Sequence, residues 1–284
     1  MTIWFSTNIP EMRAISTFNK VSTDIGDIQQ RITTGQRINS GKDDPGGLII
    51  REGLRADIKN IQALQSGMAQ AENLTNVASG GMMQLLEILR GPDTDDSTNS
   101  GLLGELYSST DHAQTKAAAQ KFMQLYDAAI TTTRYNGQSL LAGDMKDGKT
   151  FQLGGGETLT ISIDDLSTDS TTGAANNLNE AITNIDAGVD GSLEAAIASA
   201  ENLLTIISKA AGTLGSDQKV VAQNQRLLNS RLTSVTAAEG RISNADIAVE
   251  SSRMARAELL AQNAMSSIMY TRSYAAFAVS SLFR

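Results

Sequence analysis

The apolar and polar residues alternate most regularly between Ile197 and Val235, where apolar positions recur at steps of three and four residues. This spacing places them on one stripe of an α-helix, as in a coiled coil. Only Gln218 and Gln225 interrupt the stripe with polar side chains. One helix through the segment would be on the order of 60 Å long. Because it cannot bury its own stripe, the pattern predicts that other helices cover it along its length.

Three further segments have the same spacing, and each predicts a long helix. The first lies between Pro10 and Gly35, the second runs from about Gly46 to Arg90, and the third follows Gly240, which we interpret as a joint. We expect the pair Gly80-Gly81 to allow a bend in the second helix. The stripes are Ala14, Phe18, Val21, Ile25, Ile28 and Ile32; then Ile50, Leu54, Asp57, Ile61, Leu64, Met68, Ala71, Thr75, Ala78, Met82, Leu85 and Leu89; and then Ile247, Ser251, Met254, Ala257, Ala261, Ala264, Ile268, Thr271, Ala275, Ala278 and Leu282.

A charged segment, Arg37 to Asp44, connects the first two helices. Asp44 is a good N-cap and Pro45 suits a first helical position, so we expect a helix to begin there. The segment has acidic and basic groups, but no nucleophile and base accompany them. A solvated loop or an interface loop is therefore favoured over a catalytic cluster.

Between the second and fourth helices the pattern changes. A further helix is expected to begin near Asp111 and to end at the turn Arg134–Gly137. Residues 150–163 then alternate with a period of two around a glycine turn, which predicts a β-hairpin. Residues 164–193 are rich in Ser, Thr, Asn, Asp and Gly, and indicate a loop region with a short helix near Leu178 to Ile185.

The composition narrows the fold and the chemistry. Hydrophobic residues make up 40% of the 284 residues but aromatic residues only 4%, which favours closely packed helices. There is no cysteine, and the single histidine, His112, excludes a histidine metal cluster. No window has the apolar length of a membrane span, and Met1 to Pro10 lacks the features of a cleaved signal peptide. We expect no cofactor, no metal and no enzymatic activity.

The charge is unevenly distributed along the chain. The net charge of −8 disfavours nucleic acid as a partner, because phosphate binding requires a basic surface. Residues 60–240 carry ten basic and 21 acidic groups, whereas the ends are nearly neutral. This distribution favours ends that associate and an acidic middle that faces water.

Together these patterns predict a mainly α fold of long antiparallel, coiled-coil-like helices with a small β-hairpin region. The hairpin is expected near 150–163 and the loop region at 164–193, within the helical middle of the chain. The last helix also carries apolar residues off its stripe, more than one partner helix can cover, which indicates self-assembly. These residues are Met265, Met269, Tyr270, Tyr274, Phe277 and Phe283.

Several segments resemble bacterial flagellins. Gln30-Arg-Ile-Thr-Thr-Gly-Gln-Arg-Ile-Asn-Ser-Gly-Lys-Asp-Asp44 looks like the N-terminal motif of that family. The tail segments Arg241-Ile-Ser-Asn-Ala-Asp-Ile-Ala-Val-Glu250 and Val279-Ser-Ser-Leu-Phe-Arg284 are similar to its C-terminus. With only about 30 residues between Ile163 and Glu194, the chain resembles a short form without large outer domains, and it lacks the His-Glu-x-x-His of flagellins with a zinc peptidase.

The resemblance implies a structural subunit that is exported through the flagellar type III apparatus without a cleaved signal peptide and polymerises into an extracellular filament for motility. It implies that residues 1–40 and 241–284 form one helical domain, and that residues 41–240 form a helical rod that contains the hairpin near 150–163 and the loop region 164–193. It also implies an export chaperone and junction and cap proteins as partners. The implied assembly interface comprises Phe18, Val21, Ile25, Ile28, Ile32, Arg37, Asn39, Asp43, Asp44, Met254, Ala261, Ile268, Tyr274, Phe277, Leu282, Phe283 and Arg284. The alternatives are a hook-filament junction protein, which shares the terminal patterns, and a helical-hairpin binding or signalling module. An enzyme is the least supported class.

Overall fold

The computed structural model describes residues 9–91, 101–108, 112–168, 173–185 and 191–282. Within these ranges it contains seven helices and two small antiparallel strand pairs, so the predicted mainly α fold with a small β region is confirmed. The chain divides into two compact units. Unit 1 consists of residues 1–59 and 233–284, and unit 2 consists of residues 60–232.

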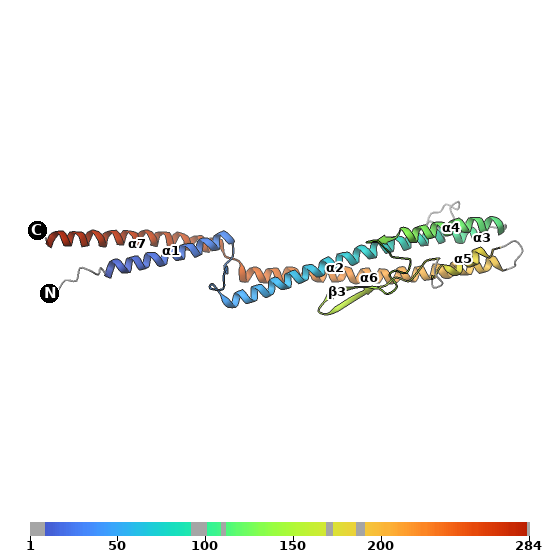
Figure 1. Cartoon of the computed structure of the whole chain (residues 1–284), viewed down its shortest axis with the longest axis horizontal. Helices are drawn as coiled ribbons and strands as arrows, with labels where there is room; N and C mark the ends of the chain where they lie inside the picture. The colour runs from blue at the N-terminus through green and yellow to red at the C-terminus, as the bar shows by residue number, and fades with distance from the viewer. Residues whose placement is uncertain (1–8, 92–100, 109–111, 169–172, 186–190, 283–284) are drawn as a thin grey trace. The chain divides into compact units, whose positions relative to one another are not determined.

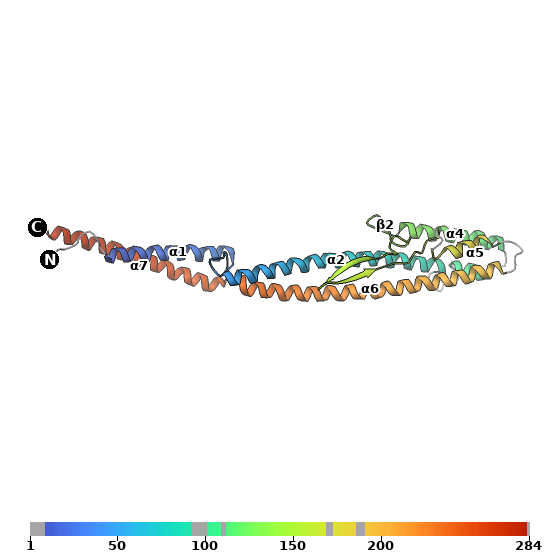
Figure 2. The same ribbon diagram turned by 60° about the horizontal axis from the view of Figure 1, so that its bottom comes forward.

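Two long helices form the axis of unit 2. Residues 60–90 of α2 (Pro45–Arg90) run antiparallel to residues 192–232 of α6 (Ser192–Ser243), as Figures 1 and 2 show. The predicted stripe of α6 is confirmed, because each of its positions from Ile197 to Val235 is buried or half-buried. On α2 the stripe is buried from Met68 to Leu89.

The two glutamines in the stripe of α6 form hydrogen bonds across the helix pair. The side-chain amide of Gln218 donates to the carbonyl oxygen of Thr75 and to the side chain of Asn76, both at 3.2 Å. Gln225 donates to the carboxylate of Glu72 at 2.7 Å. A polar group in an apolar stripe is tolerated where it finds its partner, and it then favours one register of the two helices.

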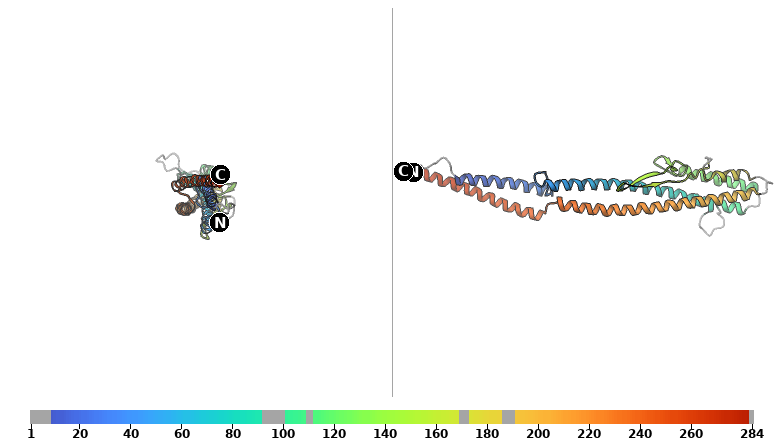
Figure 3. Two further views of the ribbon diagram at one scale, coloured as in Figure 1. Left: turned by 90° about the vertical axis from the view of Figure 1, so that its left-hand side faces the viewer. Right: turned by 90° about the horizontal axis from the view of Figure 1, so that it is seen from below.

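Shorter elements complete unit 2 beside these helices (Figure 3). Tyr126 is fully buried among them, and its hydroxyl donates to the carbonyl oxygen of Leu166 at 2.9 Å. This burial raises the pKa of the Tyr126 phenol. The elements are α3 (Leu102–Ser108), α4 (His112–Thr132), β1 (Arg134–Tyr135), β2 (Gln138–Ser139), β3 (Lys149–Gly154), β4 (Glu157–Ile161) and α5 (Asn176–Thr183).

Two details of unit 2 go beyond the sequence prediction. Helix α3 was not predicted, because seven residues show little periodicity, yet its Leu102 and Leu106 are fully buried. The expected turn at Asn136-Gly137 has positive φ at both residues, and it also joins the short strands β1 and β2. Asp111, near which a helix was expected to begin, lies outside the described residues.

In unit 1, α1 (Ile9–Thr34) and α7 (Ile247–Leu282) lie side by side and run antiparallel (Figure 1). An ion pair lies toward each end of this helix pair. Arg272 contacts Glu11 at 2.7 Å, and Arg31 lies 3.8 Å from Glu250. The stripe expected on α1 is confirmed, since all its positions from Ala14 to Ile32 are buried or half-buried.

Three sequence predictions for unit 1 are wrong, and they concern the end of α6, the start of α2 and the start of α7. α6 does not end at Gly240 but continues to Ser243, because a single glycine weakens a helix without breaking it. At the start of α2, Ile50 and Asp57 are exposed, and the buried position is taken by Arg51.

At the start of α7, Ile247 and Ser251 are likewise exposed and Glu250 is buried. Near the start of each helix, the buried position therefore lies one residue away from the predicted one, and a charged side chain occupies it.

Among the described residues, no helix has the length and the sustained apolarity needed to cross a bilayer.

We expect the two adjacent glycines of α2 to respond differently to alanine substitution. A Cβ atom at Gly81 would lie 2.5 Å from Oγ1 of Thr133 and 3.0 Å from Leu141, whereas a Cβ at Gly80 meets nothing within 4 Å. Gly81→Ala should lower the free energy of unfolding by about 1–3 kcal/mol through overpacking. Gly80→Ala should raise it by up to about 1 kcal/mol, since alanine favours the helix. Chemical denaturation followed by circular dichroism measures both, and equal effects would contradict the packing argument.

Candidate assembly surface

The seam between α1 and α7 is the apolar centre of unit 1. Val21, Ile28 and Ala257 are buried in it, and Ile25, Ile32, Met254 and Ala261 pack around them. The small alanines of α7 allow the two helix backbones to approach closely. Because burying a large apolar side chain contributes roughly 1.5–3 kcal/mol, the seam offsets the cost of ordering two otherwise marginal helices. The pairing of these stripes within one chain, which the sequence predicted, is confirmed.

The connector, residues 35–44, is bound to the link between α6 and α7. The backbone amide of Arg37 donates to the carbonyl oxygen of Ser243 at 2.6 Å, and that of Ala245 donates to Gly35 at 2.9 Å. The guanidinium of Arg37 adds a hydrogen bond to the carbonyl oxygen of Ile242 at 3.0 Å. The connector and the link between α6 and α7 are therefore joined by hydrogen bonds, which fix where α1 ends relative to the start of α7.

Asp43 organises the tip of the connector. One of its carboxylate oxygens accepts hydrogen bonds from the backbone amides of Ser40 at 2.8 Å and Asn39 at 3.1 Å, and from the Ser40 hydroxyl at 3.1 Å. The Asn39 side chain in turn donates to the carbonyl oxygen of Gln36 at 3.0 Å. The amide of Ser40, followed by that of Asn39, holds the pKa of Asp43 below its ordinary value because these donors favour the charged carboxylate.

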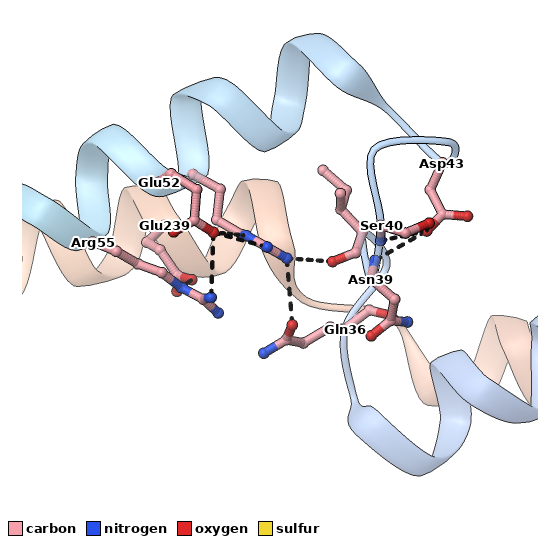
Figure 4. A network of polar contacts seen from close by, with 9 residues as sticks. Gln36, Asn39, Ser40, Asp43, Glu52, Arg55 and Glu239 are labelled. Carbon is pink, nitrogen blue, oxygen red and sulfur yellow. Dashed lines mark hydrogen bonds and ion pairs between the residues drawn. The ribbon is translucent and has the colours of Figure 1, made fainter.

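Arg51 holds the connector against α2, and sequence reasoning missed it. Its side chain is buried and donates to the carbonyl oxygen of Ile38 and, at 3.4 Å, to the side chain of Gln36. An ion pair with Glu52 at 2.9 Å balances its charge. Figure 4 shows this network together with the neighbouring pair of Arg55 and Glu239, whose atoms lie 3.0 Å apart. No local pattern predicted this role, because the acceptor, the carbonyl oxygen of Ile38, lies on the connector.

The start of α2 confirms the predicted cap. Asp44 accepts a hydrogen bond from the amide of Gly47 at 2.9 Å, and Pro45 is the first helical residue. A Cβ atom at position 47 would lie 2.7 Å from the side chain of the buried Ile38. Glycine at this position therefore allows the connector to pack directly on the first turn of the helix.

The helix pair also has apolar side chains that face water. We call them the outer apolar surface, and they include four residues that the sequence had placed outside the seam: Met265, Met269, Tyr270 and Phe277. Sequence reasoning missed the other members, although several lie next to seam positions. These are Ile9, Met12 and Ile15 of α1, and Ile247, Val249, Leu259 and Leu260 of α7.

The residues predicted for the assembly interface therefore occupy different places. Phe18 is half-buried in the seam with the other α1 positions, and Ile268 is buried in the seam. Arg37, Asn39, Asp43 and Asp44 belong to the connector, and Phe277 belongs to the outer apolar surface. The side chains of Tyr274 and Leu282, together with Phe283 and Arg284, lie outside what the structure describes. The role of these residues in assembly stays a prediction.

Comparison with known families gives two matches that together cover most of the chain. A model of the bacterial flagellin N-terminal helical region matches residues 5–146, and one of the bacterial flagellin C-terminal helical region matches residues 197–271. The matched ranges include α1, the connector, α2, most of α6, and α7 as far as residue 271.

Individual relatives show how much of a flagellin the chain spans. It is 24% identical to a flagellin of Bacillus subtilis over 88% of this chain and 90% of that protein. It is 31% identical to the B-type flagellin of Pseudomonas aeruginosa, but over 59% of this chain and only 34% of that longer protein. A structure from Vibrio parahaemolyticus, described as a flagellar hook-associated protein, superposes on 70% of the chain with a TM-score of 0.57 and 11% identity. That structural likeness concerns the fold alone.

The lowered pKa of Asp43 gives the connector a defined pH dependence. The folded-state pKa lies below 3.8, so the carboxylate contributes stability above this value, and the contribution is lost as the pH falls through the lowered pKa. We expect hydrogen-exchange protection of the Asn39 and Ser40 amides to fall as the pH decreases from about 4 through the lowered pKa of Asp43. Asp43→Asn keeps an acceptor oxygen but does not titrate, and should remove this step. An unchanged step in the variant would assign it to another group.

Proposed function

Because the chain belongs to the bacterial flagellin family, we propose that its copies polymerise through α1 and α7 into a bacterial flagellar filament that serves motility. The observation that carries this proposal is the outer apolar surface. Within one chain each terminal helix buries its stripe against the other, and large apolar side chains such as Leu259 and Tyr270 still face water.

The energetics favour other copies of the same chain as the cover for this surface. A helix with apolar side chains around most of its circumference is stable in water only when several partners surround it. Among the described residues, α1 is the one helix that packs extensively against α7. Each outer side chain gains roughly 1.5–3 kcal/mol when it is buried, and a helical polymer repeats that gain for every subunit.

The predicted interface residues then have three roles. Seam residues such as Val21 and Ile268 hold α1 and α7 together, so that the pair enters the polymer as one body. The outer residues, among them Met269 and Phe277, contact neighbouring copies. The connector residues Arg37 to Asp44 fix the end of the pair, and in this proposal they contribute to assembly by keeping both helices in register.

The wider context of the proposal rests on the family resemblance. Residues 1–40 and 241–284 would form the core of the filament and residues 41–240 its surrounding layer, with the acidic segment 164–169 facing water. The subunit would leave the cell unfolded through the flagellar type III apparatus, without a cleaved signal peptide, and would meet an export chaperone and junction and cap proteins. The role is structural and involves no enzymatic step.

Removing the tail tests the role of the seam. We expect a chain lacking residues 251–284 to form no filaments, because α1 then has no partner for its stripe. Ile268→Asp should act similarly, since it buries an unpaired charge in the seam. Both chains should keep the thermal unfolding transition of unit 2, followed by circular dichroism. Micrometre filaments of the purified parent chain in electron micrographs distinguish a filament subunit from a junction protein, and normal filaments from the shortened chain would refute the proposal.

Substitution of the outer apolar surface tests it separately from the seam. Leu259→Asp and Tyr270→Asp alter exposed side chains, so the subunit should keep its helix content and melting temperature. Polymerisation should be lost because a charge would enter the contact between copies. Gln114→Asp adds the same charge at an exposed position of α4 and is the matched control. If Leu259→Asp and Tyr270→Asp polymerise like the control, the outer surface is not the interface.

A further inference from the structure

Methionine is the only sulfur-containing residue of this chain, which has ten methionines and no cysteine. The exposed fractions of these methionines differ widely in the structure. Four lie in the core of unit 2 with exposed fractions of 0–4%: Met68, Met82, Met123 and Met145. Met254 is half-buried in the seam, and Met1 lies outside the described residues. Four are exposed, with fractions of 60% for Met12, 40% for Met265, 62% for Met269 and 67% for Met83.

Three of the exposed methionines belong to one part of the outer apolar surface. Met265 and Met269 are four residues apart on α7 and therefore share a helix face, one turn apart. The ion pair of Glu11 with Arg272 places Met12 of α1 at the same level along the antiparallel helix pair. The three thioethers thus lie at similar levels along the helix pair and belong to the surface that is proposed to contact neighbouring copies, while Met83 lies on unit 2.

We propose that Met12, Met265 and Met269 are oxidation sites of the unassembled subunit, and that their conversion to methionine sulfoxide by a peroxide prevents polymerisation. In the reaction, the sulfur lone pair attacks one oxygen of hydrogen peroxide, the O–O bond breaks, and the second oxygen leaves as water after proton transfer. The sulfide is oxidised by two electrons and the peroxide is reduced. A methionine sulfoxide reductase reverses the change.

The physical basis is the difference in polarity between the two side chains. The thioether is apolar and adapts its shape to a neighbouring surface. The sulfoxide oxygen is a strong hydrogen-bond acceptor that must lose its water when a neighbouring copy covers it. In the free subunit the oxidised side chains remain hydrated, so the fold tolerates them. In the polymer the same side chains are covered, so assembly protects them from the oxidant.

This inference rests on the proposed function, and the experiment separates the two. Purified full-length subunit is treated with hydrogen peroxide, oxidation is located by peptide mass spectrometry, and the critical concentration for polymerisation is measured. We expect sulfoxide at Met12, Met265, Met269 and Met83 before the four core methionines. The critical concentration should rise about tenfold or more, and it should return to its starting value after treatment with reductase. Filaments assembled before treatment should be oxidised much more slowly at Met12, Met265 and Met269.

Matched variants assign the effect to individual sites. A chain with Met12→Leu, Met265→Leu and Met269→Leu should polymerise after peroxide treatment, whereas Met83→Leu should stay as sensitive as the parent chain. Normal polymerisation of the parent with all three sites oxidised overturns the inference, as does inhibition that reductase does not reverse. Treatment of the oxidised parent chain with reductase tests the inference even where the triple variant assembles poorly. Failure of the untreated parent to polymerise refutes the proposed function instead.

Discussion

The burial of narrow apolar stripes between antiparallel helices is the interaction on which both units of this protein depend. Neither α1 nor α7 has a core of its own, and each would be marginal in water alone. In unit 1 the seam around Val21, Ile28 and Ala257 supplies that core. In unit 2 the stripes of α2 and α6 do the same, and shorter elements lie beside the two helices.

Polar groups decide how these stripes align. Apolar seams tolerate slippage by one heptad, because successive heptads look alike to the partner helix. Gln218 and Gln225 remove this ambiguity in unit 2, since each finds its acceptor on α2 in one register only. In unit 1 the same task falls to Arg51 and Asp43, which bind the backbone of the connector. The seam therefore supplies stability, and the hydrogen bonds supply a defined arrangement that repeated copies require.

The outer apolar surface connects this fold to its function. A subunit that buried every apolar side chain internally would be more soluble and would have no apolar surface for contact with a neighbouring copy. Here one stripe of each terminal helix is used within the chain, and residues such as Leu259 and Met269 remain for contacts between copies. The same exposure makes the thioethers of the free subunit accessible to oxidants, a liability that ends once a neighbouring copy covers them.

The sequence by itself determined the long helices, the cap at Asp44, the turn at Asn136 and the hairpin, because heptad spacing, capping and glycine turns are local properties. The family resemblance implied that the two ends of the chain pair with one another. Only the tertiary structure decided which residues face inward where helices begin. There Arg51 and Glu250 replaced the expected apolar positions, because a charged side chain can be buried where a carbonyl group or an opposite charge awaits it. The carbonyl oxygen of Ile38 and the guanidinium of Arg31, which lies 3.8 Å from Glu250, belong to other segments, so no local pattern contains them.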